Sequence, residues 1–402
     1  YMNKKPRSNR LNIAIFGKKN VGKSSLINAL TDQDIALVSE VLGTTTDPVF
    51  KSMELLPLGP IVLIDTAGLD DSGELGELRV KKSLSVLNKT DVALIVIDGR
   101  VGLSQFDKEL INKVKAKKIP GLIVVNKTDL VASTDIVSND FDIVKVSSVT
   151  KVGIEELKTK IGQISKEEEN KFKIVGDLIS PGDFVVLVTP IDNAAPKGRL
   201  ILPQQQVVRD LLDNDAIVIV TKEFDLIKTL DNLREKPKMV ITDSQAFAQV
   251  SADTPLDIPL TSFSILFARH KGDLDEMVRG AGTIESLENG DKILIAEGCT
   301  HHRQSDDIGT AKIPRWLEEY TGKELTFDHF AGHGYPENLT DYKLIIHCGA
   351  CMLNKKEMIH RINSAKEQHI PIVNYGVLIS YVHGVFERAL DLFPSAKSIY
   401  KK

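Results

Sequence analysis

The chain has little cysteine, no long apolar run and no large excess of either charge. Only 3 of its 402 residues are cysteine, which is too few for a disulfide framework and leaves one thiol unpaired. Apolar runs such as Val92–Ile97 have the length of a strand, far below the ~20 residues of a membrane helix. Lys and Arg number 51 against 55 Asp and Glu. These features exclude a disulfide-rich scaffold, and they predict no membrane segment and no coating of nucleic acid through bulk charge.

The remaining composition is that of an ordinary globular protein. Hydrophobic residues make up 42% and charged residues 26% of the chain. The first residues are polar and precede no apolar core, so we expect no targeting signal and a location in the reducing cytoplasm. The length suggests two or three domains.

Residues 11–165 alternate short apolar runs with helical patterns. The apolar runs are Leu11–Phe16, Ile61–Ile64, Val92–Ile97, Leu122–Val125 and Ile143–Val146. The helical patterns include Gln105–Lys117 and Ile154–Ile164. Apolar strands that alternate with helices predict a parallel sheet buried on both faces. We therefore expect an α/β domain over residues 1–170, closed by the charged segment Lys166–Lys173.

Two further α/β domains are expected after this charged segment. The second spans residues 174–262, and its apolar runs are Phe184–Thr189, Ala216–Val220 and Met239–Thr242. The third spans residues 263–402, with strands expected at Ile293–Ala296, Leu344–Ile346 and Pro371–Val373 and helices at Trp316–Tyr320 and Glu357–Gln368. A segment that contains Pro255 and Pro259 separates the two.

Segment Gly17–Ser24 reads GKKNVGKS and fits the phosphate-binding pattern G-x-x-x-x-G-K-[ST]. It lies where this pattern works, between an apolar strand and a helix. The glycines let backbone N–H groups turn toward phosphates. Lys23 can neutralise the β- and γ-phosphates, and the Ser24 hydroxyl can bind Mg²⁺.

Three more polar motifs follow in order. Asp65 ends a strand where its carboxylate can reach Mg²⁺ through water, and Gly68 lets the chain turn toward the γ-phosphate. Asn126-Lys127-Thr128-Asp129 follows another strand, and the Asp129 carboxylate can accept two hydrogen bonds from guanine, which adenine cannot offer. Ser147 follows the next strand and is placed to donate to the base, and loop 44–46 can supply a hydroxyl to Mg²⁺.

These motifs resemble those of the translation-factor-like GTPases, particularly the Era and TrmE branch. The resemblance implies that the domain binds GTP or GDP, that Thr45 is a Mg²⁺ ligand and that Asn20 accompanies a K⁺ ion at the phosphates. Asp71 falls where TrmE relatives carry a carboxylate; it is a candidate for activating water, with an ordinary exposed acid as the alternative. The expected nucleotide-binding residues are Gly17, Asn20, Val21, Gly22, Lys23, Ser24, Ser25, Asp65, Gly68, Asn126, Lys127, Asp129 and Ser147.

All three cysteines lie in the third domain, each just beyond an expected strand. Cys299 and His301 form a C-x-H motif, and His347, Cys348 and Cys351 form H-C-x-x-C. Ligand sites in open α/β sheets form at the carboxyl ends of strands. A C-x-x-C turn lets two thiolates converge on one metal or cluster.

The residues leave several interpretations of this cluster open. Cys348 and Cys351 could form a redox pair, or the cysteines could be buried core residues. Alternatively, the residues form a structural zinc site with three cysteines and one histidine, or hold an iron–sulfur cluster with three thiolates and a weaker fourth ligand. Candidates for the fourth ligand are His301, His347, Asp192 and Asp306.

A TrmE-like GTPase followed by C-x-H and H-C-x-x-C resembles the HydF family, the GTPase maturases of di-iron (FeFe) hydrogenase. The resemblance covers the whole chain and implies a middle dimerisation domain and a C-terminal domain with a 4Fe-4S cluster on Cys299, Cys348 and Cys351. It also implies a homodimer that holds a di-iron precursor, works with two radical-SAM maturases and delivers the precursor to apo-(FeFe) hydrogenase.

Two rival functions remain at this point. A zinc-stabilised Era/TrmE-like GTPase would act on RNA or ribosomes, although the near-neutral charge favours no nucleic-acid partner. A thiol redox enzyme would use Cys348 and Cys351.

Overall fold

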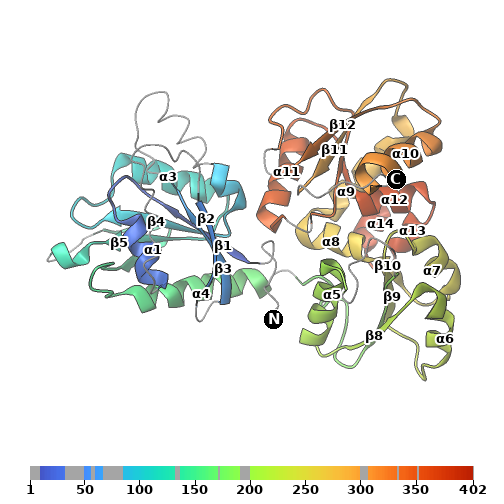
Figure 1. Cartoon of the computed structure of the whole chain (residues 1–402), viewed down its shortest axis with the longest axis horizontal. Helices are drawn as coiled ribbons and strands as arrows, with labels where there is room; N and C mark the ends of the chain where they lie inside the picture. The colour runs from blue at the N-terminus through green and yellow to red at the C-terminus, as the bar shows by residue number, and fades with distance from the viewer. Residues whose placement is uncertain are drawn as a thin grey trace. The chain divides into compact units, whose positions relative to one another are not determined.

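The computed structural model describes residues 10–31, 49–55, 59–66, 85–131, 136–170, 173–190, 200–298, 307–332, 335–350 and 353–401. The chain divides into two compact units, residues 1–171 and 172–402 (Figure 1). Both are built of parallel strands and helices, so the predicted α/β class is confirmed. Within the described ranges, no helix is both long enough and apolar enough to cross a bilayer.

The first unit is a six-stranded sheet in the order β2-β3-β1-β4-β5-β6. Its strands are β1 (Leu11–Phe16), β2 (Val49–Leu55), β3 (Gly59–Asp65), β4 (Val92–Asp98), β5 (Gly121–Asn126) and β6 (Asp142–Lys145). Strand β2 pairs antiparallel with β3, and the other neighbours are parallel. The helices include α1 (Lys23–Thr31), α3 (Gln105–Ala116) and α4 (Ile154–Asn170).

Helices cover both faces of this sheet, which explains its continuous apolar strands. Ile13 and Ile15 of β1 pack with α1 and α4 in one buried cluster. Ala14 and Phe16 point the other way and pack with α3 in a second cluster. The parallel registers bring the carboxyl ends of β1, β3, β4 and β5 to one edge, where Asp98 lies beside Asn126.

The second unit contains two four-stranded parallel sheets (Figure 1). The middle sheet has the order β10-β9-β7-β8 and comprises β7 (Phe184–Val188), β8 (Ile217–Thr221), β9 (Met239–Thr242) and β10 (Leu260–Ser262). The C-terminal sheet has the order β12-β11-β13-β14 and comprises β11 (Lys292–Glu297), β12 (Thr326–Ala331), β13 (Leu344–His347) and β14 (Ile372–Asn374). The α-helices of this unit are α5 (Leu202–Asp213), α6 (Leu226–Asp231), α7 (Phe247–Asp253), α8 (Phe263–Lys271), α9 (Leu274–Gly282), α10 (Ile313–Thr321), α11 (Lys355–Glu367), α12 (Tyr375–Val382), α13 (Phe386–Ala389) and α14 (Pro394–Tyr400).

One continuous hydrophobic core runs through both sheets of the second unit, from Ile174 to Ala396. The C-terminal segment also bonds back to the middle sheet. The Thr261 hydroxyl in β10 donates to the carbonyl of Ala389 in α13 at 3.0 Å, and Arg388 donates to the Thr254 carbonyl at 2.6 Å. Helix α13 therefore covers the β10 edge of the middle sheet.

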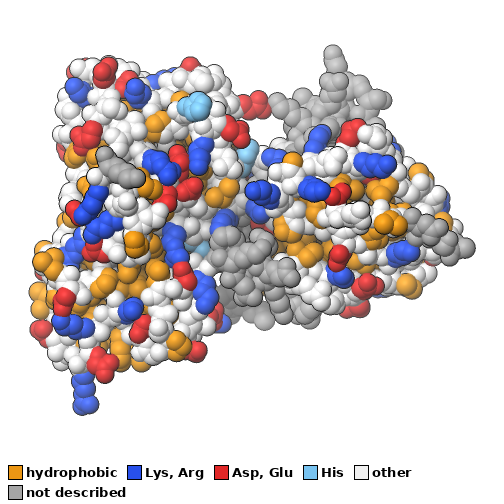
Figure 2. Space-filling model, turned by 180° about the vertical axis from the view of Figure 1, so that it is seen from behind, with side chains coloured by type: hydrophobic (Ala, Val, Ile, Leu, Met, Phe, Trp, Pro, Cys, Tyr) orange, Lys and Arg blue, Asp and Glu red, His pale blue; other side chains and the backbone are white. Residues whose placement is uncertain are grey.

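The opposite edge of the middle sheet is apolar and exposed. Ile217 and Val220 of β8 are 45% and 46% exposed, although β-branched apolar residues usually lie inside. Exposed apolar side chains flank this strand at Leu212, Phe224 and Ile227. Figure 2 shows hydrophobic side chains gathered over the middle-sheet part of the second unit. We refer to these five residues as the β8 edge.

Close packing of α9 on β14 depends on Gly280. A Cβ atom at this position would lie 2.3 Å from the carbonyl oxygen of Ile372, which is backbone and cannot rotate away. We expect Gly280→Ala to lower the free energy of unfolding of the second unit by about 1–3 kcal/mol, because α9 must move off the sheet. The single tryptophan, Trp316, lies in this unit, so its fluorescence during urea unfolding measures the change.

Gly282, at the end of the same helix, provides the matched control. A Cβ there meets nothing within 4 Å. Gly282→Ala should therefore raise stability by about 0.4–1 kcal/mol, because alanine restricts the unfolded chain. Equal effects of the two substitutions would contradict the packing explanation.

Candidate functional site

The loop between β1 and α1 can form only with glycine at two positions. Gly17 has a φ of +151°, and a Cβ there would lie 2.4 Å from the carbonyl oxygen of Val96. Gly22 has a φ of +94°, and its Cβ would lie 2.4 Å from Nδ2 of Asn126. The backbone therefore wraps tightly and leads directly into the N-terminus of α1, where unpaired N–H groups attract anions.

Lys23 places a positive charge inside this loop. Its side chain is buried, and its ammonium donates to the carbonyls of Gly17 at 2.9 Å and Lys18 at 2.8 Å. Ser24 and Ser25 follow in the first turn of α1 and are exposed. The cation, the helix N-terminus and the exposed hydroxyls together suit a polyphosphate and its metal ion.

Asp65 ends β3 beside this loop. Burial raises the pKa of its carboxyl above the ordinary value, while the charges of Lys23 and Lys51 oppose that rise. The next residue, Thr66, is buried and donates its hydroxyl to the carbonyl of Ile15 at 2.7 Å. The end of β3 is thus tied to β1, and the Asp65 carboxylate lies within the field of Lys23.

Asn126 connects the phosphate loop to the loop after β6. Its amide donates to the carbonyl of Val21 at 3.0 Å. Its side-chain oxygen accepts from the backbone N–H of Ser148 at 3.1 Å and from the Ser148 hydroxyl at 2.9 Å. Because Asn126 is almost fully buried, it is a structural tie between the phosphate side and the base side of the site.

Lys127 makes a second connection of the same kind. Its ammonium donates to the backbone carbonyl of Asn20 at 2.5 Å and to the carboxylate of Asp98 at 2.7 Å. Asn20 and Lys127 both have a φ of 64°, in the left-handed region. Hydrogen bonds from Arg100, and then from Lys127, hold the pKa of Asp98 well below its usual range, so the carboxylate stays charged.

Asp129 is exposed and oriented by its neighbour. The hydroxyl of buried Ser147 donates to Oδ1 of Asp129 at 2.6 Å and accepts from the N–H of Thr150 at 3.1 Å. The Ser147 N–H donates to the carbonyl of Val152 at 3.0 Å. Both donors of Ser147 are used within the protein, so the structure shows it orienting Asp129.

The structure brings most predicted nucleotide residues to one sheet edge. Gly17, Asn20, Val21, Gly22, Lys23, Asn126 and Lys127 are joined by the contacts above. Thr45, Gly68 and Asp71 lie outside the described residues, so their predicted roles stay predictions. Sequence reasoning missed Asp98. Like Asp65, it is an acid at the end of a parallel strand, and this pattern could have identified it.

The strands that precede the two cysteine motifs in the sequence lie side by side. Strands β11 and β13 pair in parallel, with Ala296 opposite His347. The Cys348 N–H donates to the carbonyl of Ala296 at 2.8 Å, and the Gly298 N–H lies 3.2 Å from Sγ of Cys348. Gly298, the residue before Cys299 in the sequence, therefore bonds the sulfur of Cys348.

His347 is fully buried, and both of its ring nitrogens have partners. Nδ1 lies 2.8 Å from the carbonyl of Cys348, and Nε2 lies 3.0 Å from Nη1 of Arg361. A guanidinium can only donate, so Nε2 accepts and Nδ1 carries the proton. Burial, and then the charge of Arg361, lowers the pKa of His347 to about 3, so the ring is neutral.

The described part of this region fits a thiolate-bound metal centre. Cys348 is partly exposed, and a backbone N–H already points at its sulfur, as in iron–sulfur sites. Cys299, Cys351, His301, Asp192 and Asp306 lie outside the described residues. Within the ranges described, no three His, Cys, Asp or Glu side chains form a group that could hold a metal ion.

Sequence reasoning missed the buried residues that support residues 347–353, which we call the cysteine segment. Arg361 on α11 is 1% exposed; besides His347, it bonds the carbonyl of Gly332 at 2.8 Å and approaches Glu357 at 3.4 Å. Glu357 and Arg361 are four residues apart on α11, and this spacing could have predicted their ion pair. No pattern in the sequence pointed to Lys271, which reaches the same segment from α8.

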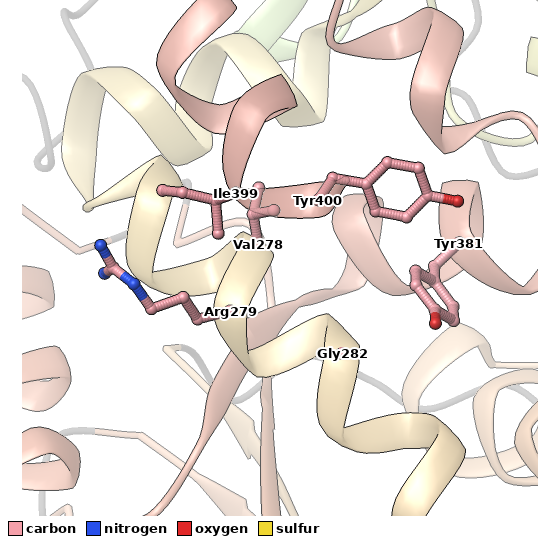
Figure 3. A pocket seen from close by; sticks show the side chains of 6 residues that line it. All are labelled: Val278, Arg279, Gly282, Tyr381, Ile399 and Tyr400. Atoms are coloured by element: carbon pink, nitrogen blue, oxygen red, sulfur yellow. The ribbon is translucent and has the colours of Figure 1, made fainter. Parts of the chain in front are cut away.

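A hollow of about 440 Å³ lies elsewhere in the second unit (Figure 3). It is lined by Val278, Arg279, Gly282, Tyr381, Ile399 and Tyr400. Figure 3 shows the two tyrosine rings on one side and Arg279 on the other. Arg279 is already paired with Glu276 at 3.0 Å, and the hollow contains none of the predicted site residues, so we assign it no ligand.

Three family models match this chain in order. Residues 12–127 match the model described as 50S ribosome-binding GTPase. Residues 174–272 match the hydrogen maturase F dimerization domain, and residues 275–392 match the hydrogen maturase F tetramerization domain. The first unit is therefore a P-loop GTPase domain, and the other two matches lie within the second unit.

Similar curated proteins match part of this chain. A tRNA modification GTPase MnmE from Alkaliphilus metalliredigens is 36% identical over 169 residues, which is 40% of this chain and 36% of that protein. One from Thermoanaerobacter sp. (strain X514) is 40% identical over 171 residues, again 40% of this chain and 36% of the relative. The chain thus spans about a third of the length of these relatives.

Among solved structures, Era in complex with MgGDPNP and a segment of 16S ribosomal RNA is 21% identical, with a TM-score of 0.34. The match covers 53% of this chain and 94% of Era. We draw nothing from a likeness of this size. The family models carry the assignment: with a GTPase domain followed by the dimerization and tetramerization domains of hydrogen maturase F, the chain belongs to the hydrogen maturase F (HydF) family.

Proposed function

We propose that this protein is a GTP-hydrolysing scaffold that holds a di-iron precursor of the hydrogenase active site and delivers it to apo-(FeFe) hydrogenase. The observation that carries the proposal is the bond from the Gly298 N–H to Sγ of Cys348, at the carboxyl ends of the paired strands β11 and β13. This contact occurs in a chain that matches the hydrogen maturase F domains and a GTPase domain, which supports a metal centre and a nucleotide switch on one molecule.

In the first unit, the residues divide between phosphate, metal and base. Lys23 can turn its ammonium from the carbonyls of Gly17 and Lys18 toward the β- and γ-phosphates. The Ser24 hydroxyl would hold Mg²⁺ directly and Asp65 through water, with Thr45 as a further ligand. Asp129, oriented by Ser147, would accept from guanine.

A K⁺ ion is the proposed source of further positive charge at the phosphates. Asn20 would hold it, and the bond from Lys127 to the Asn20 carbonyl fixes the backbone there. Water activation is assigned to Asp71. Intrinsic hydrolysis should be slow, which suits a switch that controls the association of partners.

In the second unit, Cys299, Cys348 and Cys351 would hold a 4Fe-4S cluster. Bound there, such a cluster supplies one iron without a thiolate ligand, at which a precursor can dock. Among the candidates for the fourth ligand, the engagement of both ring nitrogens of His347 favours His301, Asp192 or Asp306. The Gly298 N–H stabilises the sulfur of Cys348.

The proposed assembly is a homodimer that joins through the β8 edge and works with two radical-SAM maturases. The match to a dimerization domain supports oligomerization. The exposed apolar side chains of β8 support this strand as the interface. We propose a cytoplasmic location and no role in nucleic-acid binding.

Iron analysis tests the cluster directly. Protein purified without oxygen and reconstituted with iron and sulfide should be brown, absorb broadly near ~400 nm and contain about four irons per chain. Cys348→Ser should remove most of this iron, because two thiolates hold a cluster poorly. Its GTPase rate measured alone should be unchanged, because the nucleotide residues lie in the other unit.

Colourless protein that keeps one zinc after this treatment would overturn the proposal. It would favour a zinc-stabilised GTPase that acts on RNA or ribosomes. Full iron binding by Cys348→Ser would place the cluster elsewhere.

A further inference from the structure

A buried lysine from the dimerization domain reaches the cysteine segment. Lys271 is the last residue of α8, within the range that matches the dimerization domain, and its side chain is 4% exposed. Its ammonium donates to the carbonyls of Ala350 and Leu353, at 3.1 Å each. These acceptors are 79 and 82 residues away in the sequence, in the range that matches the tetramerization domain.

Ala350 and Leu353 stand before and after Cys351 in the sequence. The Leu353 N–H also donates to the Ala350 carbonyl at 3.2 Å, so the ends of this four-residue segment are tied together. Ala350 has a φ of 52°, a left-handed conformation that an L-residue adopts only when its surroundings impose it. The bond from Lys271 is one such constraint, because it fixes the direction of the Ala350 carbonyl.

The ends of the cysteine segment have other anchors. Cys348 is bonded to Ala296 and Gly298 of the β11 side, and His347 is bonded to Arg361. After the segment, the Asn354 side chain accepts from the Glu357 N–H and begins α11. Between these anchors, the side chain of Lys271 bonds the backbone of two described residues, Ala350 and Leu353.

A lysine suits this place for a chemical reason. An ammonium carries three donors on a flexible stem, so it can serve several carbonyls that diverge from one point. Methionine is likewise unbranched, is one heavy atom shorter and has no donor. The contacts of Lys271 should therefore be lost in Lys271→Met without creating a large cavity.

We propose that Lys271 is a positioning residue for the C-x-x-C thiolates, so that the cluster site is completed by the dimerization domain. This rests on the proposed cluster-binding function. Lys271 fixes the backbone carbonyls of Ala350 and Leu353, which flank Cys351 in the sequence, and so restricts the backbone that carries this second thiolate. Without it, Ala350 is free to leave the left-handed conformation, and the backbone leading to Cys351 is no longer fixed.

The test compares Lys271→Met with Lys366→Met, whose lysine lies on α11, is 43% exposed and pairs with Glu276 at 3.2 Å. The first readout is the iron-free protein: the rates at which iodoacetamide alkylates Cys348 and Cys351, measured by mass spectrometry. We expect the rate at Cys351 to rise at least threefold in Lys271→Met and to stay unchanged in Lys366→Met.

The second readout is the reconstituted protein. We expect Lys271→Met to bind less than half the iron of the unaltered chain and to show an altered EPR spectrum after reduction. Adding Ala350→Gly should recover part of the iron, because glycine adopts the left-handed conformation without help. If Lys271→Met does not fold, Lys271→Gln replaces it; its amide is one atom shorter than lysine and has two donors in place of three, so smaller changes in the same direction are expected.

Unchanged alkylation together with unchanged iron and EPR in the folded variant would overturn the proposal. If the unaltered chain itself binds no iron, the cluster-binding function fails, and the alkylation rates still test the role of Lys271. Far-UV circular dichroism and the fluorescence of Trp316, in the same unit, confirm that each variant is folded.

Discussion

Asp129→Asn is expected to lower the affinity for GTP by a factor of about 10² to 10⁴. The carboxylate of Asp129 would accept two hydrogen bonds from guanine, and bonds to a charged group contribute about 1.5–3 kcal/mol each. Asparagine turns one acceptor into a donor, which then faces a donor of the base. Xanthine carries a carbonyl where guanine carries its amino group, so xanthosine triphosphate should bind the variant better than GTP does.

The structure predicts that this substitution leaves the site intact. The Ser147 hydroxyl donates to Oδ1 of Asp129, and an asparagine oxygen can accept the same bond. Titration with a fluorescent GTP analogue, followed by competition with xanthosine triphosphate, measures both affinities. Asp140→Asn is the control, because Asp140 pairs with Lys115 at the surface of the same unit. Unchanged GTP affinity in Asp129→Asn would mean that guanine is recognised elsewhere.

Ile217→Lys with Val220→Lys is expected to halve the mass of the protein in solution. Strand β8 is the open edge of the middle sheet, whereas α13 covers β10 at the other edge. An exposed apolar strand edge offers unpaired N–H and C=O groups to a second copy, and natural proteins protect such edges with lysine. Two lysines would bring like charges together across a symmetric interface.

Sedimentation or light scattering at micromolar concentration measures the mass. Leu256→Lys is the matched control, because Leu256 is 88% exposed in the same domain and lies just before the covered strand β10. It should leave the mass unchanged. A double variant that keeps the mass of the unaltered chain would move the interface away from β8.

Most core strands could be predicted from the sequence, because a strand buried on both faces is apolar throughout. Leu11–Phe16 and Met239–Thr242 match β1 and β9, and Ile143–Val146 and Ala216–Val220 are displaced by one residue from β6 and β8. Strands β2, β10 and β12 were not predicted. Strands β2 and β12 lie at sheet edges and mix polar with apolar residues. Strand β10 is only three residues long.

The nucleotide site was more predictable than the surroundings of the cysteines. Each nucleotide motif follows its own strand, and parallel strands bring their ends together. The contacts that support the cysteine segment, from Lys271 and Arg361, join residues far apart in sequence. Such contacts depend on how the sheets pack, and no local pattern encodes them.

The core shared by the two sheets of the second unit also determines when each domain can fold during synthesis of the chain. Domains fold from the N-terminus as the chain emerges from the ribosome. The GTPase unit can be completed early, since its buried clusters end at Ile161 and Ile164. The middle sheet cannot, because α13 must cover β10 and its core extends to Ala396. Each new chain therefore carries a complete GTPase domain before the helices that complete both later sheets have been synthesised.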